Sequence, residues 1–355
     1  MSGLDQQMYK LVKRLFPICR SITGNGVRDT LNIIQEIIPI TQKEIASGTK
    51  VFDWTVPDEW NIKDAYVKDE KGNKVIDFKK SNLHIVGYST PFRGKLSLKE
   101  LREHLYTLPE QPELIPYITS YYKKRWGFCL THNIYKKLKE GTYEVNINST
   151  LEPGSLTYGE LIIKGKTDKE ILISTYICHP SLANNELSGP VVASYLAKYL
   201  LKKNEKLRYT YRIIFIPETI GSIAYITLHK NHLKKKVIAG YVITCVGDPG
   251  PFSYLQTRRE NTLVDRVTIH VLMNSNNKYI NTISCEPQLG KRGLYPTLST
   301  KTSGKGVRDM MNLLAYCDGK YDLLQIAEKI NCPIWTLFPI VEQLVNNNLI
   351  KIVKE

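Results

Sequence analysis

The sequence predicts an α/β protein whose mostly parallel sheet is flanked by helices, with a small inserted β-rich domain and a C-terminal winged-helix domain. Three observations predict this architecture. Strand-like and helical segments alternate from about residue 142 to residue 246, which indicates a sheet with helices on both faces. Short β-type runs between residues 51 and 88 indicate the insertion. After residue 304, three short helical patterns and a closing strand follow in the order of a winged helix.

The elements of the first 105 residues follow from local signals. Apolar spacing and β-type runs predict, in order, helices over 7–16 and 27–38, strands over 51–56 and 83–88, and a helix over 96–105. The first two helices are separated by the breaker Gly24-Asn25-Gly26. Ser97, with Glu100 three residues later, has the spacing of a helix cap.

The elements of the sheet come next. The patterns predict strands over 158–163, 171–177, 211–216 and 238–246, and helices over 189–201 and 220–230. The run 171–177 is apolar enough to be a central strand. A later run, 267–273, also alternates as a strand does and contains His270, which we expect to be packed. In open α/β sheets ligands bind beyond the carboxyl ends of the strands, so a functional site is expected there.

The C-terminal region shows helical patterns over 307–316, 323–330 and 334–345, and a strand over 349–353. The third helix would be the recognition helix of a DNA-binding winged helix. It has no Lys or Arg, and none occurs from Cys332 to Ile350. A reading helix without basic residues is poorly suited to phosphates and to guanine. DNA is therefore not an expected partner.

Composition limits the class of protein. The 355 residues carry a net charge of +15, which indicates either an anionic partner or a Lys-rich composition, and the lysines occur as small separate groups. No apolar run approaches the roughly 20 residues of a membrane helix, so no membrane association is expected. The seven cysteines are scattered singly, which favours reduced thiols. We therefore expect a cytoplasmic protein.

Three polar residues fall at the carboxyl ends of three predicted strands. His179 follows the strand 171–177, Glu218 follows 211–216, and Asp248 follows 238–246. Such ends meet at one edge of a parallel sheet, so the three side chains are expected to share a crevice. A histidine and two carboxylates suit a zinc ion and a general base. Each residue alone has an ordinary explanation as a hydrogen-bonding, turn or helix-start residue.

Several strings resemble those of a bacterial aminopeptidase-like family with a zinc-peptidase core, an inserted β domain and a C-terminal winged helix, found in surface-polysaccharide biosynthesis loci. They are Phe52-Asp53-Trp54-Thr55-Val56-Pro57, Cys178-His179-Pro180-Ser181-Leu182-Ala183-Asn184, Pro217-Glu218-Thr219-Ile220-Gly221-Ser222 and Cys285-Glu286-Pro287-Gln288-Leu289-Gly290-Lys291-Arg292-Gly293-Leu294-Tyr295-Pro296. The resemblance covers nearly the whole chain. It implies an aminopeptidase-like core at 1–45 and 115–284, a β-rich insertion at 46–114, a connecting arm at 285–303 and a winged helix at 304–355.

The resemblance also implies roles for individual residues. His179 and Asp248 look like ligands of the first metal, and Glu218 looks like the general base. Asn185 stands where the wider zinc-peptidase pattern has the aspartate that bridges two metals, and an amide oxygen is a weaker zinc ligand than a carboxylate. Glu186, the next residue, could compensate only if the loop shifts by one position.

Other departures reduce the metal site further. Thr219 replaces a second glutamate ligand, and the core lacks a C-terminal segment that supplies the last histidine, for which His270 is a less suitable substitute. We therefore expect at most one zinc ion, bound by His179, Asn185 and Asp248.

Two functions remain open on this basis. The first is a zinc-dependent aminopeptidase-like hydrolase of amide or peptide bonds, with impaired activity as an option and a possible place in surface-polysaccharide biosynthesis. Its expected partner is a small peptide-like or aminoacylated substrate, with a homo-oligomer left open. The second is a catalytically inactive pseudo-enzyme that serves as a binding or scaffold protein.

Overall fold

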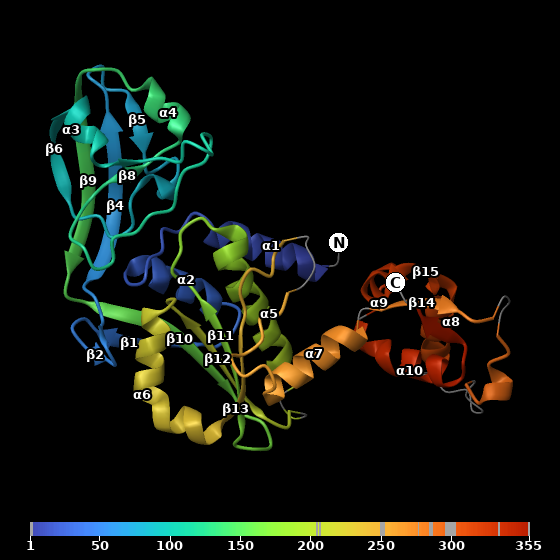
Figure 1. Ribbon diagram of the computed structural model, residues 1–355. Coiled ribbons are helices and arrows are strands. Elements are labelled where there is room, and N and C mark those ends of the chain that lie inside the picture. The colour runs from blue at the N-terminus through green and yellow to red at the C-terminus, as the bar shows by residue number, and fades with distance from the viewer. Residues whose placement is uncertain are drawn as a thin grey trace. The chain divides into compact units, whose positions relative to one another are not determined.

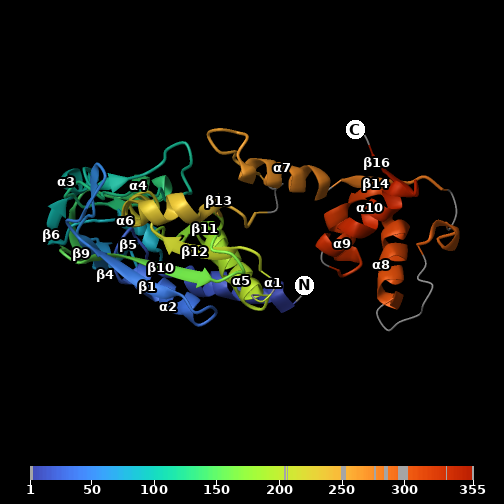
Figure 2. The same cartoon turned by 90° about the horizontal axis from the view of Figure 1, so that it is seen from below.

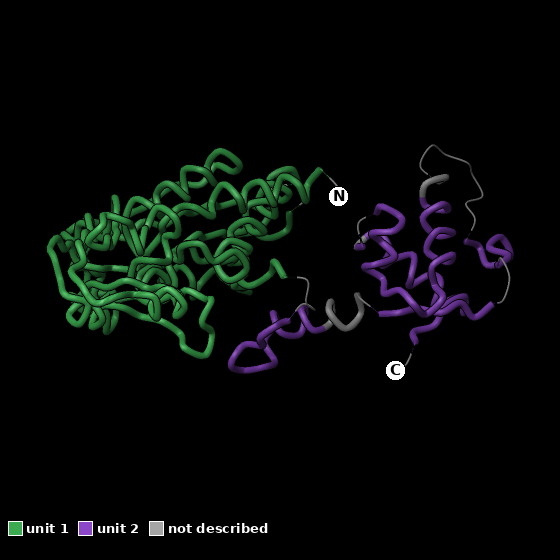
Figure 3. Tube along the Cα trace, turned by 90° about the horizontal axis from the view of Figure 1, so that it is seen from above, with its two compact units in different colours: residues 1–252 green, residues 253–355 purple. Residues whose placement is uncertain are grey.

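The computed structural model describes residues 3–203, 205, 207–248, 253–275, 277–283, 287–294, 303–332 and 334–353. The chain divides into two compact units, Met1–Phe252 and Ser253–Glu355, which are coloured separately in Figure 3. Figures 1 and 2 show the elements of each unit from two directions. In the described residues, no helix is both long and apolar enough to cross a membrane.

A five-stranded sheet forms the centre of the first unit. Its strands, in spatial order, are β1 (Thr41–Ala46), β10 (Ser155–Ile163), β12 (Thr210–Ile216), β11 (Glu170–Tyr176) and β13 (Val237–Val242). β10 is antiparallel to both β1 and β12, whereas β11 is parallel to both β12 and β13. The carboxyl ends of β11, β12 and β13 therefore lie at the same edge of the sheet.

Helices cover both faces of this sheet. They are α1 (Gly3–Leu15), α2 (Asn25–Gln35), α5 (Ser188–Leu201) and α6 (Ile220–Lys236). α2 and α5 share one apolar cluster with the sheet, and α6 belongs to the cluster on the other face. α1 packs on α5 and on the turn before it through Leu11, Leu15, Leu187 and Val191. This burial of one apolar stripe per helix fixes the layers of the core.

A second, antiparallel sheet lies in the β-rich part of the first unit. Its spatial order is β5 (Lys74–Asp77), β4 (Glu59–Lys68), β9 (Thr142–Glu152) and β6 (Phe92–Ser97). Shorter elements surround it: β2 (Lys50–Val51), β3 (Trp54–Thr55), α3 (Leu98–Arg102), β7 (Leu105–Tyr106), β8 (Phe128–Cys129), α4 (His132–Lys137) and a 3₁₀ turn at Asn82–His84. α3 begins with the predicted cap, because Ser97 and Glu100 bond reciprocally as a capping box.

The second unit contains a three-stranded sheet and helices. The strands, in spatial order, are β15 (Asp318–Asp322), β14 (Lys278–Asn281) and β16 (Ile350–Ile352). The helices are α7 (Leu263–Ser275), α8 (Ser303–Tyr316), α9 (Leu323–Lys329) and α10 (Phe338–Asn346), with 3₁₀ turns at Gly290–Arg292 and Ile334–Thr336. The predicted domain boundaries remain predictions.

Four predictions of local structure are wrong. The run 51–56 is not one strand, because the chain turns at residues 52–53 between β2 and β3, which pair antiparallel. The run 83–88 is a 3₁₀ turn followed by isolated bridges rather than a strand. The helix predicted over 334–345 is split, and α10 starts with Pro339 in its first turn. The run 267–273 lies in α7 rather than in a strand, so the strand-based argument about His270 fails; its side chain lies outside the described ones. Thr262 and Asp265 bond reciprocally at the start of α7, so a capping signal outweighs the β-branched alternation.

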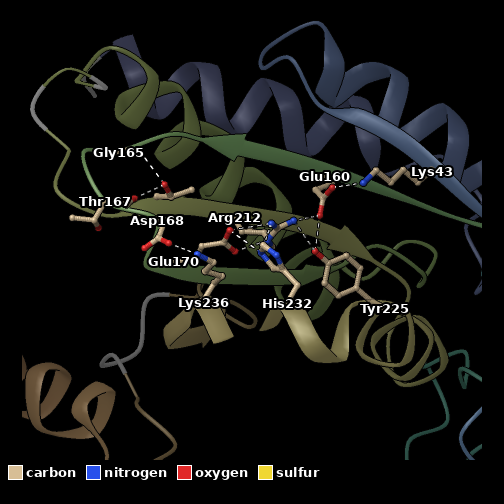
Figure 4. A network of polar contacts seen from close by, with 11 residues as sticks. Lys43, Glu160, Gly165, Thr167, Asp168, Glu170, Arg212, Tyr225, His232 and Lys236 are labelled. Atoms are coloured by element: carbon tan, nitrogen blue, oxygen red, sulfur yellow. Dashed lines mark hydrogen bonds and ion pairs between the residues drawn. The ribbon is translucent and has the colours of Figure 1, made fainter. Parts of the chain in front are cut away.

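A buried polar network joins the sheet to α6 (Figure 4). Arg212 on β12 donates to Glu160 on β10 at 2.6 Å and to Glu170 on β11 at 2.7 Å, and all three side chains are at most 7% exposed. Tyr225 of α6 donates to Glu160, and His232 of α6 lies 2.9 Å from both Arg212 and Glu170. Because α6 begins two residues after Glu218, this network also fixes the helix that carries the candidate site.

Removal of the guanidinium should strongly destabilise the first unit. Arg212→Ala leaves two buried carboxylates without their shared cation, which costs about 3–5 kcal/mol in systems of this kind. Urea unfolding followed by circular dichroism measures the loss. The matched variant Lys43→Met removes a 40% exposed partner of Glu160 and should lower the free energy of unfolding by about 1 kcal/mol or less. Equal effects of the two variants would contradict this account.

The same network should make stability depend on acid pH. Burial alone would raise the pKa of Glu160, but hydrogen bonds from Lys43 and Tyr225 and the charge of Arg212 lower it from 4.5 to about 2. The ionised carboxylate therefore stabilises the fold above pH 4.5, and this contribution is lost as pH falls toward about 2. Glu160→Gln should be less stable at neutral pH and lose less stability over this range. The exposed change Glu103→Gln should preserve the wild-type profile.

Candidate functional site

The loops that follow β11, β12 and β13 carry the candidate site. His179 lies three residues after β11, Glu218 two residues after β12, and Asp248 six residues after β13. Each loop contains a non-glycine residue in the left-handed region: Ser181 (φ 49°), Thr219 (φ 56°) and Cys245 (φ 51°). Such backbone conformations are uncommon and concentrate at functional sites, where the surrounding structure holds them.

The imidazole of His179 lies between two carboxylates. Its Nδ1 is 2.8 Å from Oε2 of Glu186, and its Nε2 is 3.4 Å from Oε2 of Glu218. The Glu186 side chain is fully buried, whereas that of Glu218 is 51% exposed. The rings of Tyr117 and Tyr176 flank the imidazole, with centroids 5.3 and 5.6 Å away. Nδ1 is therefore bonded to a buried carboxylate, and Nε2 faces the exposed carboxylate of Glu218.

Glu186 reaches His179 because the chain makes a π-helical turn over Ala183–Leu187 before α5. Single π turns inside or beside α-helices are frequent at functional sites. The turn buries Glu186 and leaves Asn185 exposed, with Nδ2 3.8 Å from Sγ of Cys245. Glu186 thus contacts Nδ1 of His179, the ring nitrogen that does not face Glu218. It does not take the position predicted for Asn185.

Arg20 lies beside Glu186 and supplies the opposite charge. Its Nε is 3.9 Å from Oε1 of Glu186, and both side chains are fully buried. The same Nε donates to the backbone carbonyl of His179 at 3.1 Å, and Nη1 donates to Leu15 and Thr30. Burial lowers the pKa of Arg20, while the charge of Glu186 opposes that effect. Arg20 therefore connects the N-terminal helices to the histidine loop.

Cys178 links the loops after β11 and β12. Its buried Sγ accepts the backbone N–H of Glu218 at 3.2 Å and lies 3.4 Å from Nδ1 of His179. Burial, with a smaller contribution from the charge of Glu186, raises the pKa of the thiol. The Cys178 thiol therefore stays protonated. It contacts both His179 and the backbone of Glu218.

Asp248 lies in a second group of contacts. Its Oδ2 accepts from Nδ2 of Asn184 at 2.7 Å, and Oδ1 of Asn184 accepts the backbone N–H of Gly247 at 2.8 Å. Ser188 Oγ accepts the N–H of Val246 at 3.0 Å. At Gly189 a side-chain Cβ would lie 2.4 Å from both Ile243 O and Thr175 Oγ1, so only glycine allows this approach of α5 to the loop.

The structure therefore brings together only some of the predicted site residues. His179 and Glu218 face each other, whereas Asn185 contacts Cys245 and Asp248 contacts Asn184. Glu186 and Arg20 were not predicted as site residues. For Arg20 a signal existed, because it is one charge among the mostly uncharged residues 15–23, and a charged residue buried in such a segment is rare unless paired.

Two sets of atoms near His179 are candidates for a metal ion. The inner set is Cys178 Sγ, a nitrogen of His179 and a carboxylate oxygen of Glu186, which lie within 4.8 Å of one another. It fits poorly, because the thiol pKa is raised and Arg20 already neutralises Glu186.

The outer set is His179 Nε2 with Glu218. A histidine Nε2 is a usual zinc ligand, and a carboxylate 3.4 Å from it is close enough to act as a general base beside the ion. The carboxylate behind Nδ1 is also a common companion of zinc-bound histidine. The residues on the outer side therefore fit a zinc ion.

Two family models and a solved structure with 39% identity support this architecture. A family described as a domain of unknown function (DUF4910) matches residues 9–287, and a winged helix-turn-helix family matches residues 277–352. The crystal structure of a putative peptidase from Clostridium acetobutylicum is 39% identical, covers 98% of this chain and 96% of its own, and superposes with a TM-score of 0.74. A zinc aminopeptidase from Bacillus subtilis is 12% identical, with a TM-score of 0.46 over 68% of this chain and 69% of its own.

A curated relative also matches this chain in sequence. It is a protein of Clostridium acetobutylicum named a putative polysaccharide biosynthesis protein with aminopeptidase-like domain, and it is 51% identical over 273 residues. The match covers 77% of this chain and 62% of the relative, so this chain spans less than two thirds of the relative's length. The resemblance found in the sequence is thereby confirmed, and the chain belongs to the DUF4910 family of aminopeptidase-like proteins with a C-terminal winged helix.

Proposed function

We propose that this protein is a zinc-dependent aminopeptidase-like hydrolase of amide bonds that uses a single metal ion. One observation carries the proposal: His179 directs Nε2 toward the exposed carboxylate of Glu218 at 3.4 Å while its Nδ1 is bonded to buried Glu186. A histidine held in this way presents a metal-binding nitrogen to the carboxyl edge of the sheet, where α/β proteins bind ligands.

The residues would divide the work as follows. His179 and Asp248 would hold the metal, with the amide of Asn185 as a weaker third ligand. Asp248 contacts Asn184 and Asn185 contacts Cys245 in this structure, so both side chains would have to turn toward His179. A bound zinc ion supplies Lewis-acid activation of the amide carbonyl and of water. Glu218, half-exposed at the start of α6, accepts the proton of the attacking water and returns it to the leaving amine. The rings of Tyr117 and Tyr176 lie beside His179 and would border a substrate bound there.

The partner and the compartment belong to the same proposal. A small peptide-like or aminoacylated substrate suits an aminopeptidase-like site, and the name of the relative supports a role in polysaccharide biosynthesis. The six described cysteines are free, which supports a cytoplasmic location. DNA and membranes are not proposed as partners, and a homo-oligomer remains an option.

The role of Glu218 can be separated from that of a ligand. Glu218→Gln should bind zinc as tightly as the wild type and lose about 10²- to 10⁴-fold in kcat on a panel of aminoacyl p-nitroanilides, because the amide cannot accept a proton. Zinc affinity is measured by competition with a chromophoric chelator. The exposed variant Glu103→Gln should change neither quantity. A joint loss of affinity and activity would show Glu218 to be a ligand instead.

Asn185 provides a test between the hydrolase and the inactive scaffold. Asn185→Asp adds a carboxylate at the position predicted to ligate, so zinc affinity should rise about tenfold, or about 1.4 kcal/mol. Asn148→Asp, an exposed change on β9 with the same charge, is the control and should have no effect. The protein is better described as a pseudo-enzyme if two results are found together. Asn185→Asp would bind zinc no more tightly than the wild type, and the wild type would bind far less than one equivalent.

A further inference from the structure

The contacts behind His179 extend the proposed function to two residues with no assigned role. We propose that buried Glu186, neutralised by Arg20, is the positioning residue that fixes His179 with its proton on Nδ1 and its free lone pair on Nε2. This inference rests on the proposed function, because it states how this chain prepares the metal-binding nitrogen. It assigns no chemical step to Glu186 or to Arg20.

The hydrogen-bonding capacity of the groups determines the tautomer. An ionised carboxylate accepts hydrogen bonds and donates none, so the 2.8 Å contact between Glu186 and Nδ1 requires the proton on Nδ1. The neutral ring then has its lone pair on Nε2, which faces Glu218. Removing the carboxylate leaves both tautomers accessible, and only one of them can bind a metal through Nε2.

Arg20 supplies the opposite charge beside this fully buried carboxylate. An isolated carboxylate in the interior would be neutralised, because burial without a partner charge is very unfavourable. Arg20 lies 3.9 Å from Oε1 of Glu186 and also bonds the carbonyl of His179, so one guanidinium fixes both the charge and the backbone. Its bonds to Leu15 and Thr30 anchor it in the N-terminal helices.

The π turn makes this arrangement possible. It places Glu186 against Nδ1 and turns the neighbouring Asn185 outward to Cys245. The carboxylate of Glu186 therefore lies at Nδ1 of His179 and not at Nε2, the nitrogen proposed to bind the metal. The effect is to orient the ligand and raise its basicity, not to add a further ligand.

Two measurements test the proposal. The first is ¹⁵N NMR of the histidine rings in zinc-free protein at about pH 8, above the pKa of a free histidine, with His179 assigned from the spectrum of His179→Ala. The second is the zinc dissociation constant from chelator competition. Glu186→Gln should give a mixture of tautomers and raise the dissociation constant about 10- to 100-fold. Glu186→Asp, which keeps the charge, should retain more of both properties than Glu186→Gln.

A second variant covers the case in which Glu186→Gln fails to fold. Arg20→Met combined with Glu186→Met replaces the ion pair by apolar side chains of similar length, which is often tolerated. It should fold, lose the fixed tautomer and bind zinc about 10- to 100-fold more weakly. The exposed Glu103→Gln is the control for both measurements.

The outcomes separate this inference from the proposed function. An unchanged tautomer in the folded variants, together with a zinc dissociation constant within about twofold of the wild type, would overturn the positioning role. If the wild type binds no zinc but its tautomer still depends on Glu186, the positioning role stands and the zinc hydrolase is rejected.

Discussion

The burial of one carboxylate, Glu186, is the constraint on which the candidate site depends. An ionised carboxylate is stable in a protein interior only when opposite charge and hydrogen-bond donors surround it. Here those groups come from the segment before α2, which supplies Arg20, and from the loop after β11, which supplies His179. The N-terminal helices, the histidine loop and the start of α5 are therefore held together by a single charge cluster.

The two buried arginines of the first unit differ in how well they are satisfied. Arg212 is shared by two carboxylates, with Tyr225 and His232 as further partners. By contrast, Arg20 Nη2 and Glu186 Oε1 make no hydrogen bond to any residue that the structure describes. Fully satisfied networks mainly stabilise a fold, whereas incompletely satisfied buried groups are tolerated where function requires them. The contrast agrees with a stabilising role for the Arg212 network and with the positioning role proposed for Glu186.

The sequence was sufficient to predict four of the five strands of the core sheet, all except β1, and the polar residues that follow three of them. His179, Glu218 and Asp248 could be placed because parallel strands align their carboxyl ends. The partner of His179 could not be predicted, because a π turn of five residues decides which of Asn185 and Glu186 points inward. Helical periodicity cannot anticipate such a turn. In the same way, the capping pair Thr262 and Asp265 gives α7 a helical start that hydrophobic alternation alone does not reveal.

The distribution of charge favours one metal ion over two. Glu186 is neutralised by Arg20, so it contributes little to the outer side of His179. The carboxylates that remain at the carboxyl edge of the sheet are Glu218 and Asp248, whose two negative charges balance one divalent cation. A second ion would require further carboxylates. Asn185 and Thr219 are neutral, and they stand where the wider zinc-peptidase pattern has metal-binding carboxylates. Uncompensated cations close together are strongly unfavourable in a site partly shielded from water. The neutral residues Asn185 and Thr219 thus suit the proposed site with one metal ion, whose histidine is fixed through Nδ1 by Glu186.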